Sequence, residues 1–282
     1  MRVLVTGSAG QLGTDVVLAC EAAGDEVIGL SRADLDISDL GAVRRVVDEV
    51  RPDAIINCAA WTAVDDCEAD PERADRINHQ GVGYLAEASA AVGAHLVQVS
   101  TDYVFDGTKS SAYTERDTPN PQSVYGATKL AGERAAGPDA TVVRTSWVCS
   151  AHGGNMVATI LRLAGAHDRL SFVADQRGNP TFTSDLALAL RQLAVDRHCG
   201  VLHVTNAETV SWFEFAQAVL EAAGGDPTRV SPITTAELLP ARPAPRPANS
   251  ALSNELFAQC GYAPLPAFRE TLPAIVAAYL PD

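Results

Sequence analysis

The fold is decided at the first turn of the chain, where residues 2–13 read RVLVTGSAGQLG. The apolar, β-branched run Arg2–Thr6 predicts a buried strand, and the pattern from Gln11 to Ala23 predicts a helix. Glycines at such a joint allow a tight turn, a close approach of the backbone to a pyrophosphate, and close packing of helix on strand. Backbone N–H groups at the helix N-terminus then face the anion. We therefore expect a dinucleotide-binding loop formed by Gly7, Gly10, Gln11, Leu12 and Gly13.

Strand and helix patterns alternate through the rest of the first half. Strands are predicted at 26–30, 54–57, 94–100 and 140–144, and helices at 41–50, 71–92 and 124–136. Nearly continuous apolar strands that alternate with helices are typical of a parallel sheet covered on both faces. The predicted class is α/β, with a Rossmann-like doubly wound sheet.

The pattern changes after Trp147, where the strands become shorter, and prolines cluster at 240–247. We predict an NAD(P)-binding Rossmann domain of residues 1–147 plus about 183–204. The remainder, about 148–182 and 205–282, is predicted to form a smaller C-terminal α/β substrate-binding lobe.

The composition limits the classes of molecule that the protein can bind. Among 282 residues, 47% are hydrophobic and 20% are charged, as in an ordinary folded protein, and the formal net charge is −14. Such a surface repels phosphate-rich nucleic acid and anionic lipid, so we expect neither nucleic acid nor a membrane as partner. The six cysteines are scattered without a CxxC pair, the first strand starts at once, and no apolar run could span a bilayer. These features favour a cytoplasmic protein with reduced thiols.

The choice of nucleotide depends on the residues after the second predicted strand. NAD enzymes usually carry an acidic residue there for the ribose 2′-hydroxyl, but here Ser31 and Arg32 follow. A guanidinium suits a 2′-phosphate, so we expect NADPH, with NADH as the alternative if Arg32 is only a surface charge. Asp36 and Ile37 lie where they can flank adenine. The acidic side chains here equally suit the N-terminus of the next helix.

A tyrosine and a lysine four residues apart, Tyr125 and Lys129, share one face of the helix predicted at 124–136. The Lys129 ammonium is expected to lower the pKa of the Tyr125 phenol, which is otherwise about 10 and poorly suited to acid–base catalysis. Lys129 can also donate to the nicotinamide ribose hydroxyls. This spacing is common in surface pairs, but its position after the glycine loop and three further strands favours a catalytic pair.

Two hydroxyl residues, Ser100 and Thr101, end the strand predicted at 94–100, where open α/β sheets bind their ligands. A hydroxyl there can donate to a substrate carbonyl. The alternative is that Thr101 caps a turn together with Asp102.

These residues resemble the dTDP-4-dehydrorhamnose reductase family within the extended short-chain dehydrogenase/reductase superfamily. The resemblance covers nearly the whole chain, and its most specific block is STDYVFDG. The blocks are TGSAGQLG (6–13), NCAAWTAVD (57–65), STDYVFDG (100–107), VYGATKLAGE (124–133), RTSWV (144–148), DQRGNPT (175–181) and RPANS (246–250).

The resemblance implies a role for each matching residue. Tyr125 would be the proton donor, Lys129 its partner, and Thr101 a hydroxyl that binds the carbonyl. The cofactor would lie along Ala59, Ala60, Thr62, Asn78 and Ser100, together with Tyr125 and Lys129. The substrate would contact Thr101, Asp102, Trp147 and, through its diphosphate, Arg246.

The chain departs from the family pattern at two places. The family usually reads AAYT and SWVYG, whereas this chain has Trp61, and Cys149 followed by Ser150. Both places are near the sugar or cofactor side, so the chemistry is retained and the exact sugar is open. We expect no metal site, because no acidic cluster matches the one at the dimer contact of some members. By analogy, the helix that carries Tyr125 suggests a homodimer.

The expected reaction is reduction of the C4 ketone of dTDP-4-dehydro-L-rhamnose to dTDP-L-rhamnose with NAD(P)H. One alternative is reduction of another dTDP-4-keto-deoxysugar in an antibiotic or glycan pathway. A second is a non-catalytic NADP-binding regulatory subunit, against which the intact Thr101, Tyr125 and Lys129 argue.

Overall fold

The computed structural model describes residues 1–280, and its centre is a six-stranded parallel sheet. Along the sheet the strands are β10 (Gly200–His203), β5 (Thr141–Thr145), β4 (His95–Thr101), β3 (Ala54–Asn57), β1 (Arg2–Thr6) and β2 (Glu26–Leu30). β2 lies on one side of β1, and β3 and the later strands lie on the other. The direction in which successive strands are added to the sheet therefore reverses at β1. Open α/β sheets bind ligands at the carboxyl ends of the strands beside such a reversal. The predicted doubly wound α/β class is confirmed.

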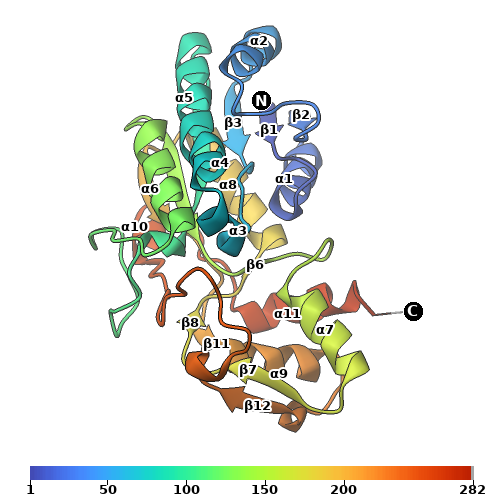
Figure 1. Ribbon diagram of the computed structural model, residues 1–282. Coiled ribbons are helices and arrows are strands. Elements are labelled where there is room, and N and C mark those ends of the chain that lie inside the picture. The colour runs from blue at the N-terminus through green and yellow to red at the C-terminus, as the bar shows by residue number, and fades with distance from the viewer. Residues whose placement is uncertain (281–282) are drawn as a thin grey trace.

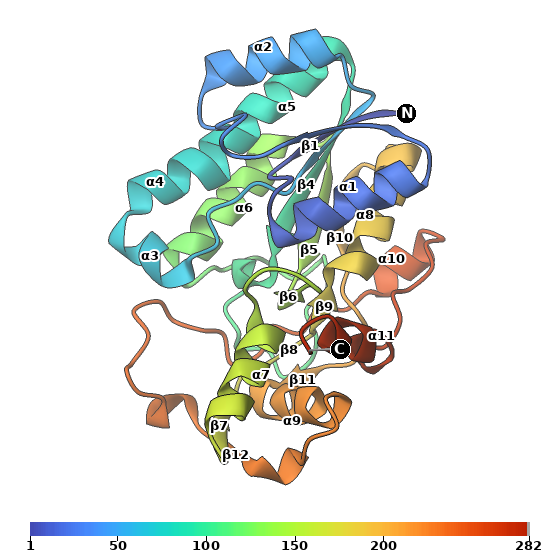
Figure 2. The same cartoon turned by 90° about the vertical axis from the view of Figure 1, so that its right-hand side faces the viewer.

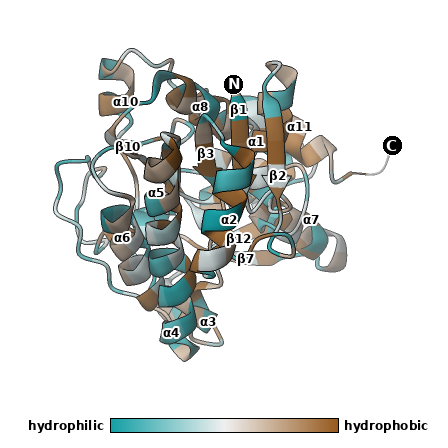
Figure 3. Cartoon of the chain, turned by 90° about the horizontal axis from the view of Figure 1, so that it is seen from above, coloured by the Kyte–Doolittle hydropathy of each residue, from teal (hydrophilic) through white to brown (hydrophobic). Residues whose placement is uncertain are grey.

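Helices cover both faces of this sheet because alternate strand residues point to opposite sides. Val3 and Val5 of β1 face α1 (Gln11–Ala22) and α8 (Thr183–Asp196), whereas the intervening Leu4 faces the opposite core. That opposite core is covered by α2 (Leu40–Val50), α5 (Gly81–Val92) and α6 (Val124–Ala136). In Figure 3 the strands β1 and β2 are coloured mainly as hydrophobic, whereas hydrophilic and hydrophobic residues are mixed along α2.

The helix predicted at 71–92 is interrupted. It is observed as α4 (Pro71–Asp75), a π-helical turn (Arg76–Gln80) and α5, and it is preceded by α3 (Val64–Ala69), which was not predicted. At the π turn, the Asn78 carbonyl lies so close to Gly132 of α6 that any side chain at Gly132 would overlap it. The wider turn therefore brings Asn78 against the helix that carries Tyr125 and Lys129.

The second half of the chain forms a lobe at the carboxyl ends of the sheet strands (Figures 1 and 2). Its core includes Phe182, Phe215 and Phe268. Its helices are α7 (Met156–Ala166), α9 (Trp212–Ala222) and α11 (Phe268–Ala277). Its strand pairs are β7 (Leu170–Val173) with β12 (Val230–Ile233), β6 (Val148–Cys149) with β9 (Thr181–Phe182), and β8 (Arg177–Gly178) with β11 (Val210–Ser211).

The core contacts differ in part from the predicted division of the chain. Residues 183–204 return to the sheet as α8 and β10. Phe257 of α10 (Glu255–Gln259) and Leu265 also pack in the core beneath the sheet, although 205–282 was predicted to belong to the lobe. The chain thus crosses back to the sheet a second time. No helix within residues 1–280 has both the length and the apolar character needed to cross a membrane.

Candidate active site

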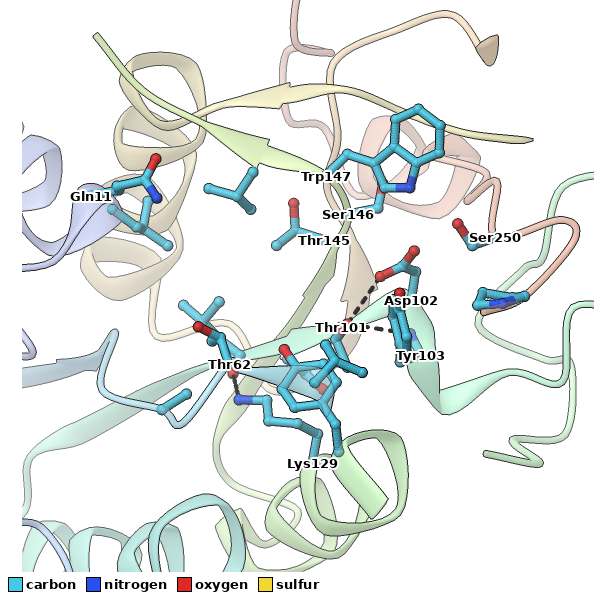
Figure 4. Close-up of a pocket in the computed structure, with 18 of the residues that line it drawn as sticks. Gln11, Thr62, Thr101, Asp102, Tyr103, Lys129, Thr145, Ser146, Trp147 and Ser250 are labelled. Atoms are coloured by element: carbon cyan, nitrogen blue, oxygen red, sulfur yellow. Dashed lines mark hydrogen bonds between the residues drawn. The ribbon is translucent and has the colours of Figure 1, made fainter. Parts of the chain in front are cut away.

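The candidate site is a pocket of about 450 Å³ between the sheet and the lobe. One wall comes from the start of α1, the ends of β4 and β5, and the first turns of α6; the other comes from the lobe and the loop that contains Arg246. In Figure 4, Trp147 and Ser250 lie on one side and Lys129 and Thr62 on the other, with Thr101 and Asp102 between them. The pocket therefore joins the glycine loop to the predicted catalytic residues.

The glycine loop has the geometry of an anion cradle. Gly7 has a φ of +67°, and a Cβ there would lie 2.7 Å from the backbone nitrogen of Ala59, so the position requires glycine. Gly10 is the N-cap of α1, and no side chain caps that helix end. The first N–H groups of α1 therefore face the pocket without a side-chain acceptor, as a pyrophosphate requires. The loop fits a dinucleotide cofactor.

Tyr125 lies at the start of α6 and lines the pocket, with only 8% of its surface exposed. Burial raises the pKa of its phenol, while a hydrogen bond with Thr101 acts in the opposite direction. The net shift of the Tyr125 pKa is thus opposite to the lowering expected from Lys129, because burial outweighs it. The Lys129 ammonium instead donates to the Val99 carbonyl oxygen at 2.6 Å. A neutral phenol is the form that can donate a proton.

Thr101 caps the turn after β4, and it also lines the pocket. Its hydroxyl accepts from the Tyr103 backbone N–H at 3.2 Å and donates to Asp102 Oδ1 at 2.9 Å, so it caps the turn after β4. The same side chain is also hydrogen-bonded to Tyr125. Burial raises the pKa of Asp102 to about 6, and its Oδ2 has no hydrogen-bond partner within residues 1–280. The end of β4 thus presents hydroxyl and carboxyl oxygens beside the phenol.

The lobe wall carries two stacked indoles. The rings of Trp147 and Trp212 are parallel within 5°, with centroids 3.5 Å apart. Trp147 has a φ of +46°, an uncommon conformation for a bulky residue, and Gly178 lies directly against its ring. This arrangement fixes a flat apolar surface opposite the tyrosine.

Arg246 reaches the pocket from the loop after the only cis peptide within residues 1–280, Leu239–Pro240. Its guanidinium binds the Asp65 carboxylate through two hydrogen bonds of 2.9 and 2.8 Å. Arg242 lies 3.5 Å from the same carboxylate. The Arg246 side chain is therefore held at the pocket edge by α3.

Sequence and structure comparisons agree with this geometry. The family model described as RmlD substrate binding domain matches residues 1–280. The dTDP-4-dehydrorhamnose reductase of Mycolicibacterium smegmatis is 45% identical over 98% of this chain and 85% of its own length. The chain belongs to this reductase family. The crystal structure of a dTDP-4-dehydrorhamnose reductase from Clostridium acetobutylicum is 40% identical, with a TM-score of 0.94 over 98% of this chain and 99% of its own. The Bacillus anthracis reductase, solved in complex with NADP, is 36% identical, with a TM-score of 0.93 over 98% of each chain.

Most residues expected from the family resemblance line the pocket. On the cofactor side these are Gly10, Gln11, Leu12, Gly13, Ala60, Thr62 and Ser100; they are joined by Thr101, Asp102, Tyr125, Lys129, Trp147 and Arg246. Ser100 differs from expectation in one respect, because its hydroxyl donates to Glu133 at 2.5 Å. Its side chain is therefore already engaged within the protein.

The other expected cofactor residues lie outside the pocket lining. Arg32 and Asp36 are exposed beyond β2, and Ile37 is buried against Gly81. Asn78 accepts from the Trp61 backbone N–H at 2.8 Å and donates to the Trp61 carbonyl at 3.1 Å. Asn78 therefore holds the backbone of the 59–62 segment in place. Ala59 in that segment packs directly against Gly7.

The sequence reasoning did not identify several pocket residues as functional. Tyr103, Gln176, Trp212 and Ser250 all line the cavity. Trp212 begins α9 directly after Ser211, whose capping box with Glu214 fixes the helix start. That capping pattern was visible in the sequence, but nothing local showed that the helix start faces Trp147. No group of three or more His, Cys, Asp or Glu residues in the described part of the chain could hold a metal ion.

Proposed function

We propose that this protein reduces the C4 ketone of dTDP-4-dehydro-L-rhamnose to dTDP-L-rhamnose with NADPH. The proposal rests on one observation: Tyr125, Lys129 and Thr101 line the same pocket as the glycine loop, where no side chain caps the N-terminus of α1. The stacked indoles and Arg246 on the opposite wall supply a surface for a nucleotide-linked sugar. Full-length membership in the reductase family supports the same activity.

Two features of the chain would hold the cofactor. The glycine loop would hold the pyrophosphate at the start of α1, and the exposed Arg32 guanidinium just beyond β2 would bind a 2′-phosphate. NADPH supplies the hydride that reduces the ketone.

The chain supplies the proton and stabilises the developing charge. As the sugar C4 gains the hydride, the carbonyl π electrons move onto its oxygen, which takes the Tyr125 phenol proton. The Thr101 hydroxyl turns from Asp102 Oδ1 to donate its proton to the same oxygen, so charge is stabilised where it develops. Lys129 then stabilises the resulting phenolate, which regains its proton from solvent. The C=O bond has become C–OH, and the enzyme is restored.

The lobe wall orients the sugar. The Trp147–Trp212 surface packs an apolar face of the deoxysugar, and Arg246 pairs with the diphosphate while Asp65 holds its guanidinium. Trp61 and Cys149, which depart from the family pattern, do not line the pocket: Trp61 packs against Arg73, and Cys149 is buried in the lobe core.

The test is a panel of dTDP-linked ketosugars assayed with NADPH through the absorbance of the reduced nicotinamide, with the product identified by NMR. We expect the highest kcat/KM with dTDP-4-dehydro-L-rhamnose and dTDP-L-rhamnose as the product. A clear preference for another ketosugar would reassign the substrate. Binding of NADPH without turnover of any ketosugar would instead support a regulatory subunit.

We also propose that the protein acts in the cytoplasm as a homodimer paired through α6. The six cysteines, all without disulfide partners, suit a reducing compartment. Light scattering of the purified protein tests the dimer: a monomeric mass at assay concentration would overturn it.

A further inference from the structure

A buried ion pair lies directly behind the catalytic helix. Arg144 of β5 donates to Glu133 of α6 through two hydrogen bonds, from Nε to Oε1 at 2.9 Å and from Nη2 to Oε2 at 2.7 Å. Each side chain is only 5% exposed. Removing two charges from water is costly, and a well-packed apolar pair is often at least as stable. The pair therefore calls for an explanation other than fold stability.

The same carboxylate connects the catalytic helix to the strand that ends at Thr101. Ser100 of β4 donates its hydroxyl to Glu133 Oε1 at 2.5 Å, and the neighbouring Val99 carbonyl accepts from the Lys129 ammonium at 2.6 Å. Lys129 and Glu133 are four residues apart and share one face of α6. Glu133 thus contacts β4 at Ser100, next to the Val99 carbonyl that binds Lys129, and β5 at Arg144.

Few groups can balance the charge of Lys129, which is itself 4% exposed. Burial lowers its pKa to about 8, and two groups oppose that change: Glu133 on its own helix and the Cys58 thiol just after β3. Burial raises the pKa of Cys58 to about 12, so this thiol is neutral at physiological pH. Tyr125, also buried on α6, is neutral, and Arg144 on β5 is a cation. Glu133 is therefore the anion available to this ammonium.

We propose that Glu133 is a positioning residue that keeps the buried Lys129 in its charged form and ties α6 to the ends of β4 and β5. The importance of that charge for turnover rests on the proposed reductase function. The charge state itself does not, because it is a property of the protein without substrate.

The direction of the effect follows from the charges. The Lys129 ammonium is present below its pKa and is lost as pH rises through it. Without the Glu133 carboxylate, Lys129 has lost its anion and Arg144 is left without a partner, so the pKa of Lys129 falls further. At neutral pH a larger fraction of Lys129 is then uncharged.

The sequence makes a direct measurement feasible, because it contains only two lysines, Lys109 and Lys129. Protein labelled with ¹³C at lysine Cε gives two side-chain signals, which the Lys109→Arg variant assigns. We expect Glu133→Gln, which keeps the side chain's shape, to lower the Lys129 titration midpoint by about one pH unit. Glu133→Asp, which keeps the charge but not the length, should restore most of that shift.

The matched control is Glu87→Gln on α5, which removes the same charge from an exposed pair with Arg44 and should leave the Lys129 midpoint unchanged. If Glu133→Gln fails to fold, Glu133→Gln/Arg144→Gln removes the unpaired Arg144 charge as well and should lower the midpoint in the same direction but by less. The proposal is overturned if the midpoint stays at its wild-type value in the folded Gln variant, or if Asp shifts it as much as Gln.

A kinetic measurement then separates this proposal from the proposed function. If ketosugar reduction depends on charged Lys129, the alkaline limb of kcat/KM moves to lower pH in Glu133→Gln, in parallel with the NMR midpoint. A shifted midpoint in a protein that reduces no ketosugar would leave the positioning role intact and refute the substrate assignment. An unshifted midpoint in a protein that does reduce the ketosugar would refute the positioning role and leave the substrate assignment intact.

Discussion

The two walls of the pocket are built differently. On the sheet wall, Thr101, Tyr125 and Lys129 are each less than a tenth exposed and are held by strand ends and a helix. On the lobe wall, Trp147, Trp212 and Arg246 are half-buried and come from a strained turn, a helix start and a long loop. From this contrast we expect the sheet wall to fix the reaction, and the lobe wall, whose parts can be replaced more freely, to select the sugar.

The largest effect is expected from Tyr125→Phe on the sheet wall. The ring and its packing remain, but the proton donor is lost, so turnover should fall by at least about 100-fold. NADPH affinity, measured by fluorescence titration, should change little, because the glycine loop and Lys129 are untouched. Turnover at the wild-type rate in this variant would show that Tyr125 does not supply the proton and that the sheet wall does not carry the chemistry.

A substitution on the lobe wall should alter substrate binding instead. In Gly178→Ala, the new Cβ would lie 2.6 Å from the Trp147 ring, so the indole must move. We expect the KM for the nucleotide sugar to rise by about tenfold, with the KM for NADPH unchanged. Gly165→Ala on α7 is the control, because nothing lies within 4 Å of its added Cβ. Equal changes in both KM values would contradict the division between the walls.

The smallest predicted effect lies on the sheet side, at its outer edge. Arg32→Gln removes the cation proposed for the 2′-phosphate, so the KM for NADPH should rise by up to about tenfold while that for NADH stays the same. Steady-state kinetics with each cofactor measure this directly. If both cofactors respond alike, Arg32 is only a surface charge.

The two walls also differ in how much of each could be predicted from the sequence. The glycine loop, the strand that ends at Thr101 and the Tyr125–Lys129 helix are local patterns, in which a short segment contains both the structure and the chemistry. Their convergence follows from the parallel sheet, which brings strand ends to one edge. That these segments meet at one pocket was therefore predictable from the sequence, whereas the role of each residue stays a prediction.

The lobe wall depends on contacts between distant segments. Trp212 meets Trp147 only because α9 packs in the lobe core, and Arg246 meets Asp65 across most of the chain. No local pattern encodes such pairings. The pKa of Tyr125 was also misjudged, because the sequence shows that a lysine is near but not that burial dominates or that its ammonium binds Val99.

The most direct test of the account follows the hydrogen itself. Wild-type protein is incubated with dTDP-4-dehydro-L-rhamnose and NADPH that carries two deuteriums at nicotinamide C4, and the product is examined by mass spectrometry and NMR. The proposed mechanism predicts dTDP-L-rhamnose with a single deuterium, bonded to C4 of the sugar. Deuterium at any other position, or oxidation of NADPH without a labelled sugar, would contradict it.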